Sequence, residues 1–413
     1  MKTSFFRAVS PAEFTDLLRS FPILGTETVD LDQAIDRVLG IDLVASEDLP
    51  LVARSCMDGY AVRAVDLFGA SESAPSYLDL RGSLQIREIS TEVLAPGTCL
   101  AITTGGTLPP GADAVVMVEH TDRLDETTIE VRRPLAPGEN VMLRGEDVIT
   151  GTVALTAGTR IRVQEAGLLA ALGQTEVVVR RRPRVAIIST GDELVPVNGK
   201  PVPGQVRDVN SVTLAGLVRA HGGLPLAMGI VPDRFEDLAQ ALARALDQAD
   251  VACLSGGSSV GTRDLTVNVI EARSDSEILA HGVTISPGKP TILARCGNTP
   301  VLGLPGQVTS AQVVMLVFGG PLLWHLQGRA DAFDSEIRPI RPAVLSRNLA
   351  SKPGREDYVR VALEPATEGR SLAVPVTGKS GLLRTLLDAQ GLLTIPASCE
   401  GLTAGSPVNV WMI

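Results

Sequence analysis

The sequence is poor in aromatic residues and in the residues that build disulfide or metal frameworks. Phe, Trp and Tyr make up 3% of the 413 residues, so the cores must consist mainly of Val, Leu, Ile and Ala. Five cysteines are scattered without a C-x-x-C pair, and four histidines are isolated. This spacing argues against a structural zinc site or a disulfide framework, and it favours reduced cysteines in a cytoplasmic protein.

Excess positive charge and a long apolar run are also missing. The formal net charge is −10, which argues against a general nucleic-acid binder but is compatible with a small anionic ligand in a locally positive pocket. No apolar run near the N-terminus suits a signal peptide. The most apolar segment, 313–324, falls short of the about 20 residues of a membrane span and contains Gly319-Gly320-Pro321. We therefore expect a cytoplasmic protein without a membrane segment.

The length of the chain predicts two to four domains. Apolar periodicity predicts helices over 10–20, 30–39 and 161–172. Between about 46 and 152, short apolar runs alternate with Gly/Pro turns, which is typical of a small all-β domain.

Residues 184–327 have a different pattern, in which apolar strands alternate with amphipathic helices. This alternation predicts a parallel, doubly wound α/β sheet. Residues 330–413 return to short strands and indicate a small C-terminal β-domain. In the α/β section the strands are expected at 184–189, 224–231 and 251–255, and the helices from Asn210, over 234–248 and over 308–327.

Polar residues follow three of these strands. Ligands of open α/β sheets bind outside the carboxyl ends of the strands, where glycines let backbone N–H groups approach an anion. Carboxylates at such a place are useful when they hold Mg²⁺ against phosphate oxygens. The residues concerned are Thr190, Gly191 and Glu193 after the first strand, Asp233 after the second, and 256–261 with Asp264 after the third.

Each of these features also has a purely structural interpretation. Asp233 with Glu236 fits a capping box, and spacing alone favours this cap over a ligand role. Glu193 fits a first-turn acid of a helix. The stretch 254–264 fits a turn, and it matches neither the dinucleotide fingerprint nor the P-loop. Asp58-Gly59, Thr104–Gly106 and Arg144–Asp147, taken singly, are also turns.

The motifs become specific as an ordered set. Together they resemble the MoeA family of molybdopterin molybdenumtransferases and the homologous E domain of gephyrin, over almost the whole chain from about residue 7. The matching stretches are MDGYAVR (57–63), ITTGG (102–106), RGED (144–147), STGDEL (189–194), SGGSSVGTRD (255–264), SPGKP (286–290), GLPG (303–306) and PGREDYVRV (353–361).

The resemblance implies a multidomain α/β plus β protein that forms homodimers. Its site would lie in a cleft between the α/β domain of one subunit and the inserted β-domain of the other. The implied parts are an elongated helical and mixed N-terminal domain (7–45 with 153–180), an inserted β-domain (46–152), a doubly wound molybdopterin-binding α/β domain (181–329) and a small C-terminal β-barrel (330–413).

The implied reaction joins molybdate to the dithiolene of adenylylated molybdopterin, with Mg²⁺-dependent release of AMP. The upstream molybdopterin adenylyltransferase would be a further partner. By motif, the catalytic residues would be Asp58, Thr104, Asp147, Glu193, Asp233 and Asp264, of which the last three would hold Mg²⁺. The cofactor-binding residues would be Thr190, Gly191, Ser255, Gly256, Gly257, Ser258, Ser259, Gly261, Lys289, Pro305, Gly306 and Arg355.

The chain departs from the family pattern where two lysines are usual, because it carries Gly282 and Ser286 there. His281, Lys289 or Arg263 would have to supply the missing positive charge. A tungstate-preferring transferase and a non-catalytic molybdopterin carrier or scaffold are therefore alternatives. A nucleotide phosphohydrolase is a weaker alternative, since it would not need the two β-domains.

Overall fold

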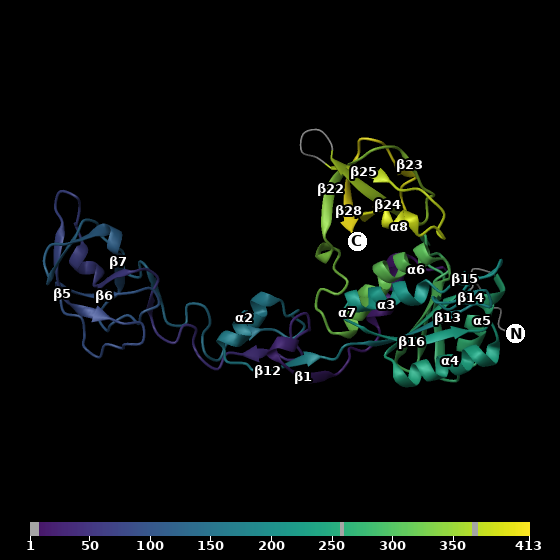
Figure 1. Ribbon diagram of the computed structural model, residues 1–413, viewed down its shortest axis with the longest axis horizontal. Coiled ribbons are helices and arrows are strands. Elements are labelled where there is room, and N and C mark those ends of the chain that lie inside the picture. Colours follow the sequence, from purple (N-terminus) through teal and green to yellow (C-terminus); the bar gives the residue numbers. More distant parts are fainter. Residues whose placement is uncertain (1–7, 257–259, 366–370) are drawn as a thin grey trace.

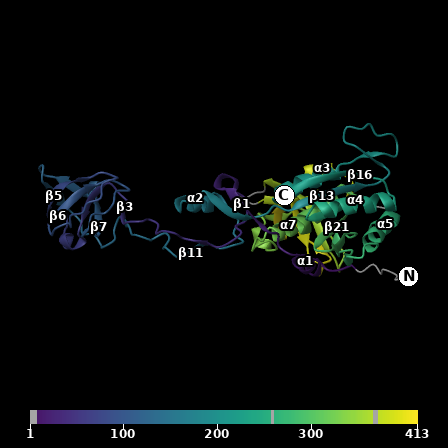
Figure 2. The ribbon, with the colours of Figure 1, turned by 90° about the horizontal axis from the view of Figure 1, so that it is seen from below.

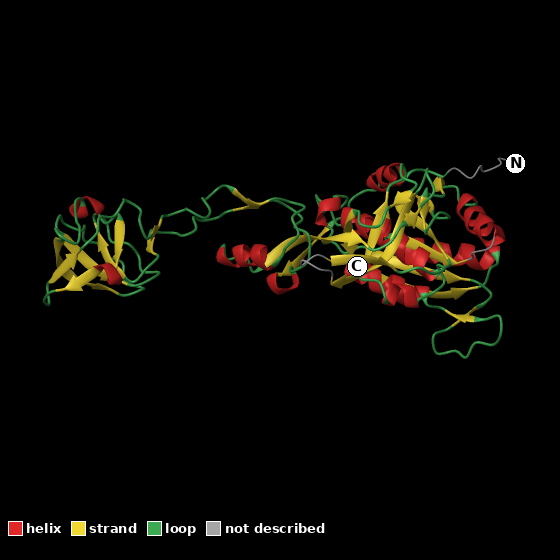
Figure 3. Cartoon of the chain, turned by 90° about the horizontal axis from the view of Figure 1, so that it is seen from above, coloured by secondary structure: helices red, strands yellow, loops and turns green. Residues whose placement is uncertain are grey.

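The computed structural model describes residues 8–256, 260–365 and 371–413, with the backbone alone for 260–264. The molecule is elongated (Figures 1 and 2). A stem of two stretches, 26–45 and 153–180, joins a distal β-domain, 54–148, to the α/β and C-terminal domains at the opposite end. Figure 3 shows that the connection between stem and distal domain is mostly loop.

The α/β domain contains a six-stranded sheet in the order β16-β13-β17-β21-β20-β18. The first four strands are parallel, as expected. Ile187 pairs with Cys253 and Ile188 with Leu254, so that successive residues face opposite sides of the sheet. The strands are β13 (Arg184–Thr190), β16 (Leu224–Val231), β17 (Val251–Gly256), β18 (Ser276–His281), β20 (Ile292–Cys296) and β21 (Thr299–Pro305).

The sheet is mixed rather than wholly parallel, because β18 and β20 run antiparallel to their neighbours. Only the two residues Gly297-Asn298 connect β20 to β21. A connection this short permits only an antiparallel pair, and Gly297 supplies the positive φ of 57° that such a turn needs.

Helices cover both faces of this sheet, which confirms the doubly wound arrangement. One apolar core packs Val185 and Ile187 against α3 and the helix of residues 308–326, and the other packs Ala186 and Ile188 against α4 and α5. Leu238 on α4 is fully buried, which contributes about 1.5–3 kcal/mol. The helices are α3 (Asn210–Ala220), α4 (Phe235–Gln248) and α5 (Val260–Glu271).

The helix predicted over 308–327 is confirmed, and it passes through Gly319-Gly320-Pro321 without a break. It continues through these residues as α6 (Val308–Val314), a π-helical turn (Met315–Gly319) and α7 (Gly320–Leu326). The wider turn relieves the clash between the proline ring and the preceding carbonyls. By length and composition this helix could span a membrane, but 78% of its most apolar window is buried inside the protein. It therefore serves as a core helix.

The first helix, α1 (Pro11–Arg19), also packs on the α/β core. It begins with a capping box in which Ser10 and Glu13 bond each other's backbone N–H groups. Its Phe14 is fully buried, with its ring centroid 4.6 Å from that of Phe318. This helix was expected over 10–20 and is confirmed.

The C-terminal domain is a barrel, as expected. Five strands close into a barrel because β24 pairs with both β25 and β26. The short strand β19 of the α/β domain pairs with the start of β24. The elements are β19 (Ile285–Ser286), a 3-10 turn (Ser335–Ile337), β22 (Ile340–Leu345), β23 (Leu349–Ala350), β24 (Glu356–Pro365), β25 (Ser371–Pro375), α8 (Arg384–Leu387), β26 (Gly391–Ile395), β27 (Gly401–Leu402) and β28 (Pro407–Met412).

In the stem, the predicted helix over 161–172 is confirmed as α2, but the predicted helix over 30–39 is wrong. Only a 3-10 turn, Leu31–Gln33, forms there. Asp36 has a positive φ of 65°, and Leu39 forms a bridge to Val179, so tertiary pairing overrides the helical pattern. The stem elements are β1 (Thr26–Asp30), β2 (Leu43–Val44), β11 (Val153–Leu155), α2 (Val163–Ala171) and β12 (Glu176–Arg180).

The distal β-domain contains a six-stranded sheet in the order β7-β4-β6-β5-β9-β8, which confirms the all-β prediction. Its own buried core includes Leu67, Leu78 and Ile129. The elements are β3 (Arg54–Ser55), β4 (Gly59–Val62), β5 (Ser76–Leu84), β6 (Thr98–Ile102), β7 (Ala114–Met117), β8 (Thr121–Arg123), β9 (Thr128–Val131) and β10 (Val141–Met142), with 3-10 turns at Ala64–Leu67 and Val118–His120.

Candidate functional site

A cleft of about 330 Å³ opens at the carboxyl ends of β13, β17 and β21. Five of the residues expected to form the site line it, namely Thr190, Glu193, Ser255, Gly256 and Gly306. They converge because parallel strands end at one edge of a sheet. We call this space the carboxyl-end cleft.

Asp233 is joined to this edge through Thr190. The Thr190 hydroxyl donates to Asp233 Oδ1 over 2.6 Å, and Asp233 N–H donates to Asp192 Oδ1 over 3.2 Å. The capping box favoured for Asp233 is wrong, since the N-cap of α4 is Arg234 and receives no side-chain cap. The carboxylate is instead turned to the neighbouring strand end.

Glu193 lies in a turn between β13 and the short strand β14 (Leu194–Val195), which pairs with β15 (Val206–Arg207). It is therefore not a first-turn acid of a helix, and that interpretation is wrong. Gly191 has a φ of 153°, and a Cβ there would lie 2.6 Å from Glu193 Oε2. The φ of Gly191 is one that residues with a Cβ rarely adopt, so a glycine is favoured at this position.

Gly256 is required for close contact between two strand ends. A Cβ at Gly256 would lie 2.2 Å from Thr190 Cγ2, and Gly256 pairs with Pro305 of β21 in the sheet. Gly257, Ser258 and Ser259 lie outside the described residues. The helix α5 begins at Val260, so a helix N-terminus follows the strand as expected. Gly261 and Asp264 are in this helix, and their side-chain surroundings are not described.

Sequence reasoning missed a buried polar centre in the cleft. The Asn210 amide donates to Ser255 Oγ over 2.7 Å and to the Gly306 carbonyl over 2.9 Å, while its own Oδ1 is buried without a partner among the described residues. Asp208 is also buried and accepts from Ser211 N–H over 3.0 Å. The sequence signal that could have identified this centre is the pair Asp208 and Asn210 at the predicted start of a helix.

The C-terminal domain also contributes to the cleft, through Gly381 and Leu383. The Thr309 N–H donates to the Ser380 carbonyl over 3.1 Å and fixes this loop against the start of α6. Gly381 and Leu383 were not predicted, because the sequence does not show how the C-terminal domain packs on the α/β domain.

Lys289 and Arg355 lie at the junction of these domains and are not among the residues lining the cleft. Strand β19 places Ser286 opposite Asp357, close to both. Arg355 pairs with Asp357, with 3.2 Å between Nη2 and Oδ2. An Arg355 contact to a further anion would thus compete with a carboxylate already in place.

The remaining predicted residues lie at the far end of the molecule (Figure 1). There Asp58 Oδ1 accepts from the backbone N–H and the hydroxyl of Thr104, over 2.7 and 2.9 Å. These two hydrogen bonds lower the pKa of Asp58. Thr104 therefore orients the Asp58 carboxylate and stabilises its ionised form.

The loop that carries Asp147 is held by Asp48, a residue that sequence reasoning missed. Asp48 accepts from the N–H and hydroxyl of Thr150 and from Arg144 Nε, over 2.8, 2.6 and 2.6 Å. These contacts, the Thr150 hydroxyl first, lower the pKa of Asp48 to about 2. Since Asp147 N–H also donates to the Leu49 carbonyl, the loop is fixed at several points.

Within one chain, then, the structure assembles two separate polar sites. Family models match this chain in order along its length. They are the MoeA N-terminal region (domain I and II) at residues 9–173, a "Probable molybdopterin binding domain" at 186–325 and the MoeA C-terminal region (domain IV) at 342–413. This order defines a multidomain protein of the molybdopterin-biosynthesis class.

Individual relatives cover nearly the full chain. A molybdopterin molybdenumtransferase 2 of Mycobacterium tuberculosis is 36% identical over 93% of this chain and 94% of its own, and the Bacillus subtilis molybdopterin molybdenumtransferase is 32% identical over 94% and 90%. A crystal structure of a molybdopterin biosynthesis MoeA protein from Pyrococcus horikoshii matches with a TM-score of 0.84 at 30% identity, covering 98% of this chain and 100% of the other. The chain belongs to the MoeA family.

Proposed function

We propose that this chain inserts molybdenum into adenylylated molybdopterin and releases AMP with the help of Mg²⁺. The coarser activity follows from its family: it is a molybdopterin molybdenumtransferase of molybdenum cofactor biosynthesis. The finer reaction rests on the carboxyl-end cleft, which Thr190 and Glu193 line together with backbone groups that suit a phosphate. Asp233 is joined to this edge by the Thr190 hydroxyl.

The donor atoms at this edge suit Mg²⁺, which prefers oxygen ligands and usually needs only one or two carboxylates beside substrate phosphates. Glu193 lines the cleft, and Asp233 is oriented by the Thr190 hydroxyl. No cluster of three acidic, histidine or cysteine ligands exists among the described residues, and the Asp264 side chain is not among them. In the proposal Glu193, Asp233 and Asp264 hold the ion, which would neutralise charge on the phosphoanhydride.

The chain's own residues would bind and orient the substrate. The backbone of 256–261, which includes the first residues of α5, would hold a phosphate. Gly306 lines the cleft, and Gly191 and Pro305 would contact the substrate from the adjoining strand ends. The Asn210 amide fixes Ser255, so the Ser255 hydroxyl is presented in one orientation. Lys289 and Arg355 would meet an anion that approaches from the C-terminal domain.

We further propose that the working form is a homodimer. Asp58, Thr104 and Asp147 belong to the distal β-domain, which lies at the opposite end of the molecule from the α/β domain (Figures 1 and 2). A second copy can bring its distal β-domain over the carboxyl-end cleft, so that acids from both subunits form one site. Exposed apolar residues would be covered in this assembly, among them Leu51 and Val52 in the connection between stem and distal domain and Met57 in the distal domain.

Localisation and partners follow from the same reaction. All five cysteines are free, and three of them are buried, which suits a reducing cytoplasm. The upstream molybdopterin adenylyltransferase is the proposed donor, because its product would be the substrate of this reaction. The alternatives are a tungstate-preferring transferase, favoured by Gly282 and Ser286 in place of two family lysines, and a carrier without catalysis.

The decisive experiment incubates the pure protein with adenylylated molybdopterin, Mg²⁺ and either molybdate or tungstate. We expect AMP release together with cofactor that activates an apo-enzyme. Tight binding without AMP release would identify a carrier. A faster reaction with tungstate than with molybdate would identify the tungstate-preferring enzyme.

A further inference from the structure

A second cavity, of about 460 Å³, lies at the junction of the stem and the α/β domain. The stem contributes Asp36, Val38 and Arg160 to its lining. The α/β domain contributes the end of α3, the first residues of β16 and the end of α7. We call it the arginine pocket, because Arg160, Arg182, Arg219 and Arg329 all line it.

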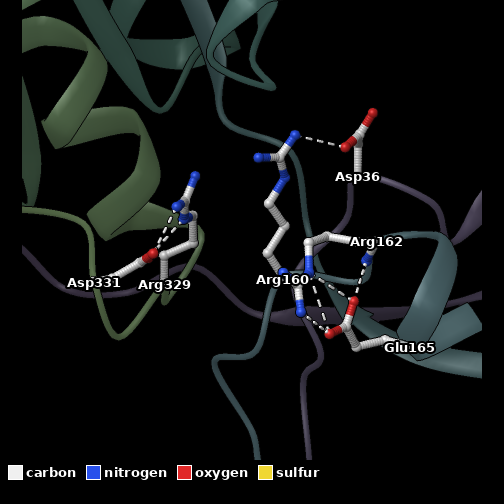
Figure 4. Close-up of polar contacts among 6 residues, drawn as sticks. All are labelled: Asp36, Arg160, Arg162, Glu165, Arg329 and Asp331. Atoms are coloured by element: carbon white, nitrogen blue, oxygen red, sulfur yellow. Dashed lines mark hydrogen bonds and ion pairs between the residues drawn. The ribbon is translucent and has the colours of Figure 1, made fainter. Parts of the chain in front are cut away.

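This pocket has more positive than negative charge. Arg160 pairs with Asp36 over 2.7 Å, and Arg329 pairs with Asp331 over 2.8 Å. Figure 4 shows both ion pairs, next to a third between Arg162 and Glu165. Neither Arg182 nor Arg219 has an ion-pair partner in the described part of the chain. Two guanidinium charges are thus uncompensated within a protein whose net charge is −10.

Helix capping does not account for these arginines. Two helices, α3 and α7, end at the pocket, and cations favour helix C-termini. However, their last carbonyls already accept from other groups. Gly223 N–H donates to the Val218 carbonyl over 2.9 Å, and the Gln327 amide donates to the carbonyls of Leu323 and His221. The guanidinium groups of Arg182 and Arg219 therefore remain available to a ligand.

The floor of the pocket consists of packed rings. Trp324 lies under the Arg329 guanidinium, 4.5 Å from its centre, and 5.0 Å from the His221 ring. His221 Nδ1 is 2.7 Å from the Leu217 carbonyl and must donate to it, while burial chiefly lowers the pKa of the ring. His221 is therefore neutral near pH 7, and the charge of the pocket comes from its arginines.

We propose that the arginine pocket binds a phosphate monoester of a small organic molecule. Two free guanidinium groups match the charge of about −1.5 to −2 on such a phosphate at pH 7, and the guanidinium fork suits its oxygens. The volume of 460 Å³ is within the range of small-molecule sites and leaves room for an organic group. Val38, Leu224 and Pro225 give that group apolar walls.

This site is distinct from the carboxyl-end cleft. The arginine pocket includes Leu224 at the start of β16, which pairs with Arg184, whereas the cleft includes Thr190 at the end of β13. The seven residues of β13 separate the two ends by about 20 Å. Because both the stem and the α/β domain line the pocket, a bound anion would fix the angle of the stem and hence the position of the distal β-domain.

The test is calorimetric titration of the full-length protein with ribose 5-phosphate, using ribose as an uncharged control and glutarate as a dicarboxylate control. We expect saturable binding of ribose 5-phosphate and none of ribose. The double variant Arg182→Gln/Arg219→Gln should raise its Kd at least about tenfold, since each guanidinium makes charge-assisted hydrogen bonds. The matched variant Arg87→Gln/Arg341→Gln, which removes two exposed arginines elsewhere, should bind like the wild type.

A further variant separates the two sites. Asn210→Ala changes the carboxyl-end cleft, so an unchanged Kd for ribose 5-phosphate would place the ligand in the arginine pocket, and a Kd raised only by this variant would overturn the proposal. Absence of saturable binding, or binding that the double arginine variant does not weaken, would also overturn it. Tighter binding of glutarate than of ribose 5-phosphate would overturn the assignment to phosphate monoesters.

Discussion

The carboxyl-end cleft and the acidic site of the distal β-domain carry similar residue types in opposite environments. In the cleft, Thr190 and Ser255 are almost fully buried, and hydrogen bonds link residues from separate strands. In the distal domain, Asp58 and Thr104 are exposed, and both hydrogen bonds from Thr104 go to the one carboxylate of Asp58. The cleft is thus a preorganised pocket, whereas the distal site gains a dry environment only if another surface covers it.

The largest expected effect comes from removing Glu193, a carboxylate that lines the cleft. Glu193→Ala should lower AMP release from adenylylated molybdopterin at least about 100-fold, because the reaction loses a positioned carboxylate. AMP is measured by chromatography, and dimer mass and melting temperature should stay unchanged. The control is Glu236→Ala, an exposed acid on α4, which should keep activity within about twofold. Undiminished activity of Glu193→Ala would remove this residue from the mechanism.

Subunit mixing tests whether the two polar sites work together. Asp58→Ala and Glu193→Ala should each be inactive alone, but an equal mixture of the two variants should recover about a quarter of wild-type activity. Half of the mixed dimers would be heterodimers, and each would contain one intact composite site. Activity is followed as AMP release after exchange of subunits. No recovery, despite heterodimers seen by mass spectrometry, would contradict a site shared between subunits.

A smaller effect should follow from loss of the hydroxyl that orients Asp233. Thr190→Val keeps the side-chain volume but removes a donor to a carboxylate, so we expect about a tenfold fall in activity and a higher Mg²⁺ requirement. The measurement is AMP release across a Mg²⁺ titration. Thr213→Val, whose hydroxyl contacts only helix carbonyls, is the matched control and should leave the Mg²⁺ requirement alone.

Stability should depend on the buried centre of the cleft. Asn210→Ala removes two hydrogen bonds but also an unpartnered buried oxygen, so the free energy of unfolding should fall by only about 1 kcal/mol. Denaturant unfolding of the α/β domain measures this change. A loss of several kcal/mol would mean that Asn210 Oδ1 has a partner.

The smallest effect concerns pH and the distal domain. The pKa of Asp48 is about 2 in the folded protein, below its ordinary value of 3.8, so its contribution to the loop of Asp147 is present above about pH 4. It should be lost as the pH falls through about 2. Hydrogen exchange of the Thr150 amide should accelerate over that range, and Asp48→Asn should remove the pH dependence. An amide rate that does not respond to pH beyond the intrinsic exchange chemistry would show that Asp48 does not hold this loop.

Much of the fold could be predicted from the sequence. The strand over 224–231 and the helices near 210, 235 and 163 were predicted because their periodicity and length are local properties. The helix over 30–39 failed because Leu39 pairs with Val179, a contact that no local pattern contains. The helix over 308–327 was predicted despite Pro321, but the π-helical turn at 315–319 could not be predicted from the apolar pattern.

The site shows the same division. The sequence by itself determined the family, the order of the domains and the residues at the strand ends, because motifs and strand patterns depend only on residues that are close in the chain. Only the tertiary structure decided that Asp233 bonds Thr190 rather than capping a helix, and that Asn210 links Ser255 to Gly306 in the cleft. It also decided that the distal β-domain, which carries Asp58, lies far from the α/β domain. These facts depend on which distant segments pack together, and free energies of packing are properties of the whole fold.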